Sequence, residues 1–122
     1  MAITALTPTR LVSMTGVVVT AGAGTAINDA NSMTIPYPKD GELIITIDSN
    51  HADTAATVAA SDYAVSAGLA PTTMAVGDTI IHMFVIGESA KYKKSTDGLI
   101  SLTWATNSAG FITTWYLPTS VT

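Results

Sequence analysis

The stretch Glu42–Asp48, ELIITID, decides the fold class of this chain. Its side chains alternate between two faces, and one face holds Leu43, Ile45 and Ile47. The opposite face holds Glu42, Thr46 and Asp48. A period of two is the spacing of a β-strand with one buried face. The stretch therefore predicts a strand that packs on a core through its aliphatic side.

Further strand signals lie on both sides of this stretch. Upstream, Ser32–Ile35 predicts a short strand that ends at Pro36-Tyr37-Pro38. Downstream, Ala55–Ala60 predicts another strand. A helix across the Ala-rich run Ala52–Ala70 is rejected, because β-branched residues interrupt it and no apolar stripe recurs at helical spacing.

A hairpin is predicted where Thr72–Val76 and Thr79–Ile86 flank Gly77-Asp78, since this dipeptide is a turn signal. Both faces of Thr79–Ile86 are apolar. Such a strand is typical of a sheet covered on both sides. We therefore expect Thr79–Ile86 to be a central strand.

A last hairpin is predicted from Leu99–Ala105 and Phe111–Leu117. Trp104 and Trp115 alternate with apolar neighbours there, so we expect both in the core. The chain then contains about eight or nine short strands and no convincing helix. This pattern predicts an all-β fold, an antiparallel β-sandwich or a jelly-roll-like barrel.

The length of 122 residues fits one β-domain spanning 1–122. Met1–Arg10 is rich in Thr, and Pro8 favours extended backbone at Thr7. Residues 1–10 are therefore predicted to form an extended N-terminal arm. Leu11–Thr20 predicts one or two strands.

The composition predicts a surface that other molecules cover. Charged residues make up 11% of the chain, whereas a typical soluble domain has roughly 25%. Hydrophobic residues make up 48%, and the mean hydropathy is +0.40. Abundant Thr and Ala would suit a flat, neutral interface. The simpler alternative is a low-charge sandwich that stays in water.

Several functional classes are disfavoured by the same composition. The chain has no Cys, so it has no disulfide, thiolate zinc site or Cys nucleophile. A net charge of −4 argues against a nucleic-acid partner. The N-terminus lacks the pattern of a signal peptide, and no apolar run approaches the ~20 residues of a membrane span. An intracellular product without processing and without a membrane partner is the expectation.

No constellation of residues predicts catalysis, a cofactor or a metal site. His51 and His82 are the only histidines, and two His without a third ligand are weak evidence for zinc. The loop Asp48–Asp53 bears oxygen ligands for calcium, but it lacks the Gly and Glu of the helix–loop–helix site. A Ser89–Lys91 dyad is rejected because Lys91 stands beside further solvated lysines.

The segment Lys91-Tyr92-Lys93-Lys94 groups basic side chains around one aromatic. Such a cluster can contact an acidic protein surface. It can equally be a solvated loop that protects a sheet edge from pairing. Both interpretations stay open.

The order of elements carries a family resemblance. The matching segments, in chain order, are ELIITIDSN, TAATVAA, APTTMAVGDTIIHMFV, ESAKYKKSTDGLISLTW and a closing strand that ends in Leu117-Pro118. With these features, Glu42–Pro118 resembles the small decoration proteins, also called cement or head-stabilising proteins, that bind the outside of tailed-bacteriophage capsids. The first 41 residues match less well.

The resemblance implies a structural, non-enzymatic protein with no catalytic residue and no cofactor. It implies a β-sandwich or barrel that binds the phage major capsid protein, often clusters as a homotrimer, and resides on the capsid exterior of the virion after synthesis in the host bacterial cytoplasm. The N-terminal arm and the basic segment are then the candidate partner contacts: Thr4, Leu6, Thr7, Thr9, Arg10, Lys91, Tyr92 and Lys93.

Two other interpretations remain beside this one. A carbohydrate-binding or adhesin-like β-sandwich module of a phage tail or fibre would expose at least one Trp or Tyr platform. A tail-tube subunit would polymerise into tubes. An enzyme is the most distant possibility.

Overall fold

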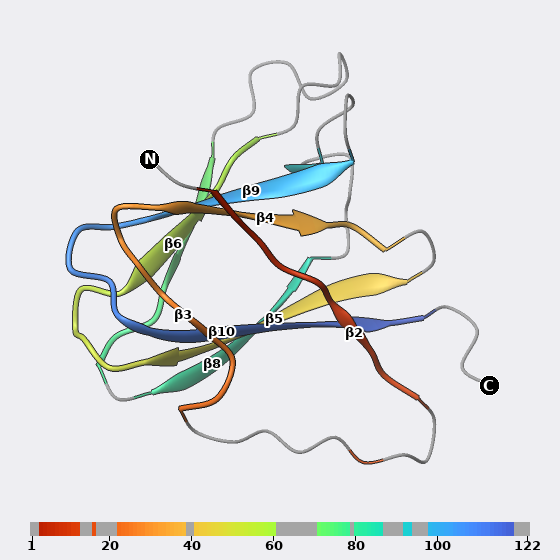
Figure 1. The fold of residues 1–122 in the computed structure, drawn as a ribbon, viewed down its shortest axis with the longest axis horizontal. Helices are drawn as coiled ribbons and strands as arrows, with labels where there is room; N and C mark the ends of the chain where they lie inside the picture. The colour runs from red at the N-terminus through yellow and green to blue at the C-terminus, as the bar shows by residue number, and fades with distance from the viewer. Residues whose placement is uncertain are drawn as a thin grey trace.

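The chain folds into two packed β-sheets (Figure 1). The computed structural model describes residues 3–12, 16, 22–38, 41–60, 71–78, 80–86, 92–93 and 98–118. These residues form ten strands: β1 (Ile3–Ala5), β2 (Thr9–Arg10), β3 (Thr25–Ala26), β4 (Ser32–Pro36), β5 (Glu42–Ser49), β6 (Ala55–Val58), β7 (Thr72–Ala75), β8 (Ile81–Ile86), β9 (Leu99–Trp104) and β10 (Gly110–Leu117). An apolar helix of membrane-spanning length is absent from these ranges.

We call the two layers sheet A and sheet B. Sheet A has the strand order β1-β4-β9-β6-β7. Sheet B has the order β2-β10-β5-β8, and β3 also pairs with β10. The predicted all-β sandwich is confirmed. It has ten strands instead of eight or nine, and its sheets are mixed, because β1 pairs with β4 and β2 pairs with β10 in parallel.

The core lies between the sheets, and β5 supplies its centre. Leu43, Ile45 and Ile47 are fully buried, as the alternation predicted. They belong to one cluster with side chains of both sheets: Leu6, Met33, Ile35, Ala56, Val58, Met74, Val76, Ile86, Ile100, Leu102, Trp104 and Ile112. A single core of this kind makes each sheet depend on the other.

Both predicted hairpins are wrong. β7 pairs with β6 in sheet A, whereas β8 pairs with β5 in sheet B, so Gly77-Asp78 joins the two sheets. In the same way β9 lies in sheet A and β10 in sheet B. A turn signal indicates that the chain reverses direction, but it does not show whether the two flanking strands pair with each other. Strands in opposite sheets of a sandwich have the same alternation of side chains as paired strands.

The predicted central position of Thr79–Ile86 is also wrong. β8 is an edge strand of sheet B that pairs with β5 alone among the described strands. Its two apolar faces have different surroundings, because only one of them is turned to the core. The other is exposed on the surface of the protein.

The N-terminal segment lies on both sheets of its own domain. β1 extends sheet A along β4, and Leu6 N donates to Thr34 O at 2.8 Å. The chain then crosses to sheet B, where Leu11 N donates to Tyr116 O at 2.9 Å. Figure 1 shows this red segment running from one layer to the other. Most of Leu11–Thr20, where one or two strands were predicted, lies outside the described residues.

Candidate interaction surface

The side of sheet B that is turned away from the core is the candidate surface. We call it the outer face of sheet B. The register places Ile44 opposite Val85 on one side and opposite Trp115 on the other. Thr46 lies in the same way between Met83 and Thr113. These rows lie on the face opposite Leu43, Ile45 and Ile47, which are buried.

Large apolar side chains are exposed on this outer face. On β8, Ile81 is 49% exposed, Met83 63% and Val85 57%. Leu117 of β10 is exposed on the same face, two residues beyond Trp115. Scattered apolar residues on a surface are ordinary, but a row of three on one strand is a patch that favours an interface.

Among the described strand residues whose side chains lie on the outer face of sheet B by the β5 register, the charged ones stand at the ends of β5. Glu42 stands at one end of the strand and Asp48 at the other. One Asp48 carboxylate oxygen accepts a hydrogen bond from Gly22 N at 2.7 Å. The middle of the face is therefore uncharged, and covering it desolvates no ion.

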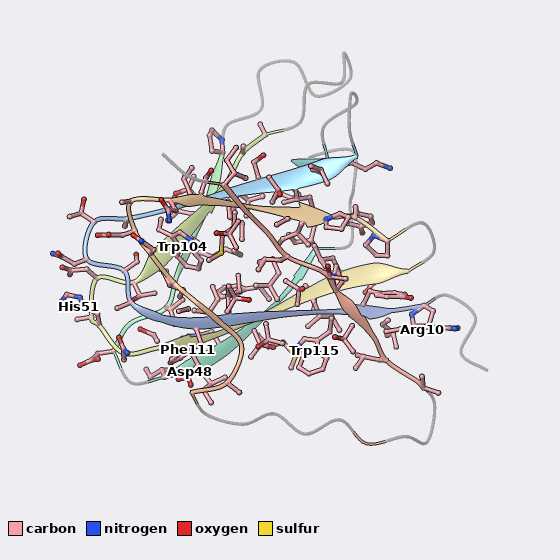
Figure 2. The ribbon with its side chains drawn as sticks, in the orientation of Figure 1. Arg10, Asp48, His51, Trp104, Phe111 and Trp115 are labelled. Carbon is pink, nitrogen blue, oxygen red and sulfur yellow. The ribbon has the colours of Figure 1, made fainter. Side chains whose placement is uncertain are left out.

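Trp115 is buried on the outer face rather than in the core. Its indole Nε1 donates to Thr46 Oγ1 at 3.2 Å, and Figure 2 shows its ring on the side of β10 away from the sandwich interior. The core prediction is confirmed for Trp104, a member of the core cluster. Trp115 is buried as predicted, at 9% exposure, but it lies outside that cluster, because it pairs with Ile44, whose side chain is on the outer side of β5.

The outer face of sheet A has a different chemistry. Cross-strand rows place Thr34 beside Ser101, and Thr57 between Thr103 and Thr73. Thr57 Oγ1 and Thr73 Oγ1 are 3.4 Å apart and share a hydrogen bond. Hydroxyl groups can hydrogen-bond to water, so the middle of this face suits water, whereas Ile3 on the edge strand β1 is 68% exposed.

The predicted contact residues of the N-terminal segment divide by burial. Leu6 is 7% exposed and belongs to the core, so its side chain stabilises the fold. Thr4 is half-buried. Thr7, Thr9 and Arg10 are exposed, and their contact with a partner stays a prediction.

Of the basic segment, the structure describes Tyr92 and Lys93, and Tyr92 lies away from the N-terminal arm. Lys91 is outside the described residues. Tyr92 packs against the core and its hydroxyl lies 3.1 Å from Thr72 Oγ1, next to β7. Lys93 is half-buried. Since β1 and β7 are opposite edges of sheet A, the structure does not bring the two predicted contact groups together.

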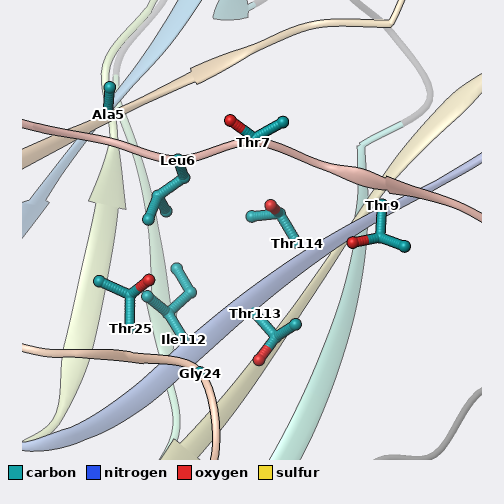
Figure 3. A pocket seen from close by; sticks show the side chains of 9 residues that line it. All are labelled: Ala5, Leu6, Thr7, Thr9, Gly24, Thr25, Ile112, Thr113 and Thr114. Carbon is teal, nitrogen blue, oxygen red and sulfur yellow. The ribbon is translucent and has the colours of Figure 1, made fainter.

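A small pocket lies where the N-terminal segment meets β10 (Figure 3). β3 pairs with Phe111 and Ile112, and β2 pairs with Trp115 and Tyr116, which leaves a gap between the two short strands. The cavity has a volume of about 140 Å³. Its lining is neutral and rich in hydroxyl groups: Ala5, Leu6, Thr7, Thr9, Gly24, Thr25, Ile112, Thr113 and Thr114. This lining contains no acid, base or charged side chain.

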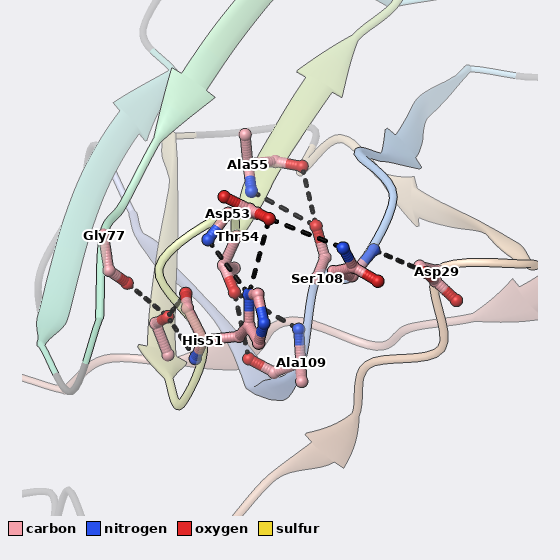
Figure 4. A network of polar contacts seen from close by, with 10 residues as sticks. Asp29, His51, Asp53, Thr54, Ala55, Gly77, Ser108 and Ala109 are labelled. Atoms are coloured by element: carbon pink, nitrogen blue, oxygen red, sulfur yellow. Dashed lines mark hydrogen bonds and ion pairs between the residues drawn. The ribbon is translucent and has the colours of Figure 1, made fainter.

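The turns at one end of the sandwich share a polar network (Figure 4). Thr54 Oγ1 donates to Ala109 O and accepts from Ala109 N, both at 3.2 Å. Asp29 Oδ2 accepts from Asn107 N at 2.7 Å, and Asn107 has a φ of 72°. Ser49 Oγ donates to Gly77 O. These bonds join loops of both sheets, so the network stabilises the fold.

The candidate ion ligands do not converge. Asp53 N donates to His51 Nδ1 at 3.1 Å, which occupies that nitrogen. Asp48 accepts from Gly22, and Asp53 lies 3.4 Å from Asn107 Nδ2. Nowhere in the described ranges do three His, Asp or Glu side chains gather as a metal site would require.

His82 faces the interior from β8. Its ring stacks on Phe84 with centroids 5.8 Å apart, and its Nδ1 is buried without a hydrogen-bond partner. All the described aromatic side chains are buried or half-buried. In this part of the chain, a flat exposed aromatic platform is absent.

The residues that the sequence analysis missed are Ile81, Met83 and Val85. The sequence contained a sign of this exposed row, because a strand with apolar side chains on both faces needs a layer of protein against each face. The prediction took both covering layers from this chain, whereas the described fold supplies only the one on the core side.

Comparisons of the chain with protein-family models, with curated proteins and with solved structures found no significant match.

Proposed function

We propose that this protein is a structural component of a tailed-bacteriophage virion that binds the outer surface of the capsid and stabilises the shell. The observation that supports it best is the exposed apolar row Ile81, Met83 and Val85 on the outer face of sheet B. The 11% charge content of the chain supports the same function. In this proposal, the outer face of sheet B contacts the major capsid protein.

Burial of this face supplies the binding energy. Removing a Val, Ile or Met side chain from water contributes about 1.5–3 kcal/mol when burial is complete. The outer face of sheet B presents four exposed side chains of this class, since Leu117 adds to the row on β8. Its uncharged middle region adds no desolvation penalty for ions.

The proposed mechanism is thermodynamic linkage. A protein that binds the assembled lattice, and not the dissociated subunits, shifts the equilibrium toward the assembled shell. Many copies add their contributions when each one spans neighbouring subunits. On the lattice the copies cluster as homotrimers, and exposed residues of the N-terminal segment, such as Thr7, Thr9 and Arg10, add contacts at the rim. No enzymatic step, nucleic acid or membrane takes part.

Co-sedimentation with undecorated capsids tests the proposal. The capsids are assembled without this protein from the major capsid protein of the phage proposed to carry it, and are then mixed with increasing amounts of this protein. We expect saturable binding and a higher temperature of capsid disassembly. Protein that stays in the supernatant at every concentration would contradict the proposal.

The carbohydrate-binding alternative has less support. Sugar recognition on a β-sandwich relies on exposed aromatic rings, and the described aromatic side chains are buried or half-buried. A glycan panel monitored by tryptophan fluorescence separates the two functions. A saturable change with a glycan, without capsid binding, would favour the alternative.

A further inference from the structure

The edge of sheet B formed by β8 is open. Ser49 N donates to Ile80 O at 3.0 Å, so these two residues form a hydrogen-bonded pair of the antiparallel β5–β8 ladder. Hydrogen-bonded and non-hydrogen-bonded pairs alternate along such a ladder. The backbone N–H and C=O groups of Ile81, Met83 and Val85 therefore point away from β5, toward an edge where no described strand pairs.

The other sheet edges lack this combination. β1 has 3 residues, β7 has 4, and β2 and β3 have 2 each, whereas β8 has 6. Short edge strands resist pairing with other chains, and so do charged residues and prolines. β8 has the sequence IHMFVI, without Lys, Asp, Glu, Pro or Gly. Its sequence therefore lacks the charged residues and prolines that keep an edge strand from pairing, and its described pairing with β5 runs without a bulge.

The same strand is complementary to itself. Like charges that face each other across two strands are destabilising, and β8 has no formally charged residue to oppose its own copy. In an antiparallel pairing centred on Met83, Met83 lies opposite Met83 of a second copy, and Ile81 lies opposite Val85. This register pairs every outward-pointing residue of both strands and forms about six hydrogen bonds.

We propose that β8 pairs with β8 of a second copy of this chain across a two-fold axis, joining the two B sheets edge to edge. The contact uses the backbone edge and leaves the outer face of sheet B uncovered. Two outer faces then form one continuous apolar surface. The inference concerns the free protein and goes beyond the proposed function, since a monomer could bind a capsid.

Cysteine cross-linking tests the register, because the chain has no native Cys. In the Met83→Cys variant the two introduced thiols lie on opposite residues about 5.5 Å apart between Cα atoms. We expect a covalent dimer under mild oxidation or with a short bis-maleimide linker. Ile81→Cys alone should not cross-link, since position 81 of the two copies is roughly 13 Å apart at about 3.3 Å per residue. A mixture of Ile81→Cys and Val85→Cys should give mixed dimers.

Edge blocking tests the contact itself. The Met83 N–H points to the open edge, so Met83→Pro removes no bond to β5 but prevents pairing with a second copy. Sedimentation velocity should show a dimer for the native protein and a dissociation constant raised more than about tenfold for Met83→Pro. Met83→Lys, which opposes two ammonium groups at the axis, is the second variant and replaces Met83→Pro if circular dichroism shows that the proline unfolds the strand. Leu117→Lys on β10 is the matched control and should dimerise normally.

Four outcomes overturn the inference. The first is a monomeric native protein at about 100 μM, where interfaces of micromolar affinity would be occupied, and the second is a trimer in solution. The third is an unchanged dimer in the folded Met83→Pro or Met83→Lys variant. The fourth is equal cross-linking of Met83→Cys and of Thr103→Cys on sheet A. A monomer that still sediments with capsids would leave the proposed function standing. A β8-linked dimer that does not sediment would support the inference while contradicting that function.

Discussion

The outer faces of sheets A and B differ in chemistry although both are pleated surfaces on one sandwich. Sheet A presents rows of hydroxyl groups, such as Thr57 beside Thr73. Sheet B presents exposed methyl and thioether groups, such as Val85 and Met83. Among the described residues, the cross-strand rows at the centre of each face contain no charged side chain. Low charge alone therefore does not identify an interface, and the distinction lies in whether the neutral groups can hydrogen-bond to water.

The two sheets also differ in their glycines, because three of them lie close against the backbone of sheet B. A Cβ on Gly24, Gly41 or Gly110 would contact backbone carbonyl groups of β10 or β5, and all three positions lie in or beside sheet B. Sheet B is thus held by close backbone contacts at both ends of its central pair. We expect its outer face to be rigid as a result.

Among the variants that test this difference between the sheets, Gly110→Ala should have the largest effect, a loss of stability. Gly110 has a φ of 131°, and a Cβ there would clash with Asp48 O and with Ser49 Cα at 3.1 Å. The free energy of unfolding should fall by about 3 kcal/mol, the upper end of the cost of backbone strain. Urea denaturation measures it.

The matched control is Gly22→Ala, which has a φ of 78° and open space around the added Cβ. It should cost about 1–2 kcal/mol, from the left-handed backbone alone. Equal losses for the two variants would show that the close approach of β5 and β10 does not stabilise sheet B.

Leu117→Lys and Thr103→Lys compare the two faces directly. Both positions are exposed, one on sheet B and one on sheet A. Leu117→Lys should weaken capsid binding about 10- to 100-fold, as expected for the lost burial of one large aliphatic side chain. Thr103→Lys should change it by less than about twofold. Quantitative co-sedimentation measures both, and an equal or greater loss for Thr103→Lys would assign the contact to the other face.

Thr46→Val tests the buried polar pair on the outer face of sheet B. Without the Thr46 hydroxyl, the Trp115 indole N–H is left buried and unpaired, which should cost about 1–3 kcal/mol in unfolding free energy. Thr57→Val on sheet A removes a partly exposed hydroxyl and should cost less than about 0.5 kcal/mol. In a Trp115→Phe background, the Thr46→Val loss should shrink. A full-size loss there would show that Thr46 acts without Trp115.

The smallest expected effect is that of Tyr37 ionisation on the stability of the protein at alkaline pH. Its hydroxyl donates to Ile86 O at 2.7 Å and so connects the segment after β4 to β8 of sheet B. Burial, and then the Glu42 carboxylate, raise the pKa of Tyr37 above its ordinary value.

The sign of the effect follows from this direction. As pH rises past about 10, the unfolded chain loses the phenol proton before the folded protein does. Tyr37 therefore lowers the stability only above that pH, and not below it. Chemical denaturation of the native protein and of Tyr37→Phe between pH 8 and 11.5 should show a steeper decline for the native protein. Parallel curves would contradict the assignment.

The strands were predictable where local alternation decides them, and the pairing was not. The period-two pattern of Glu42–Asp48 located β5 and its buried face correctly. The hairpin signals failed at Gly77-Asp78 because strand pairing in a sandwich is decided by which sheet completes the core. The short strands β2 and β3 had no sequence signal, since two residues show no period. Their positions come from the free edge of β10.

That a partner covers part of the surface stays a prediction, and the exposed apolar side chains lie elsewhere than the sequence indicated. Low charge and high hydropathy indicated a covered surface, which the sequence analysis assigned to Thr and Ala. The apolar row lies on β8 instead. The sequence cannot show that β8 is an edge strand, because this depends on the strand order of sheet B.

The central place of β10 in sheet B has a consequence for synthesis. β10 pairs with β2, β3 and β5, yet it follows all of them in the chain. While the ribosome is still making residues before 110, the earlier strands of this sheet lack their common neighbour. We therefore expect the domain to fold after translation of this region, in one cooperative step, so that nascent chains stalled before β10 remain sensitive to protease.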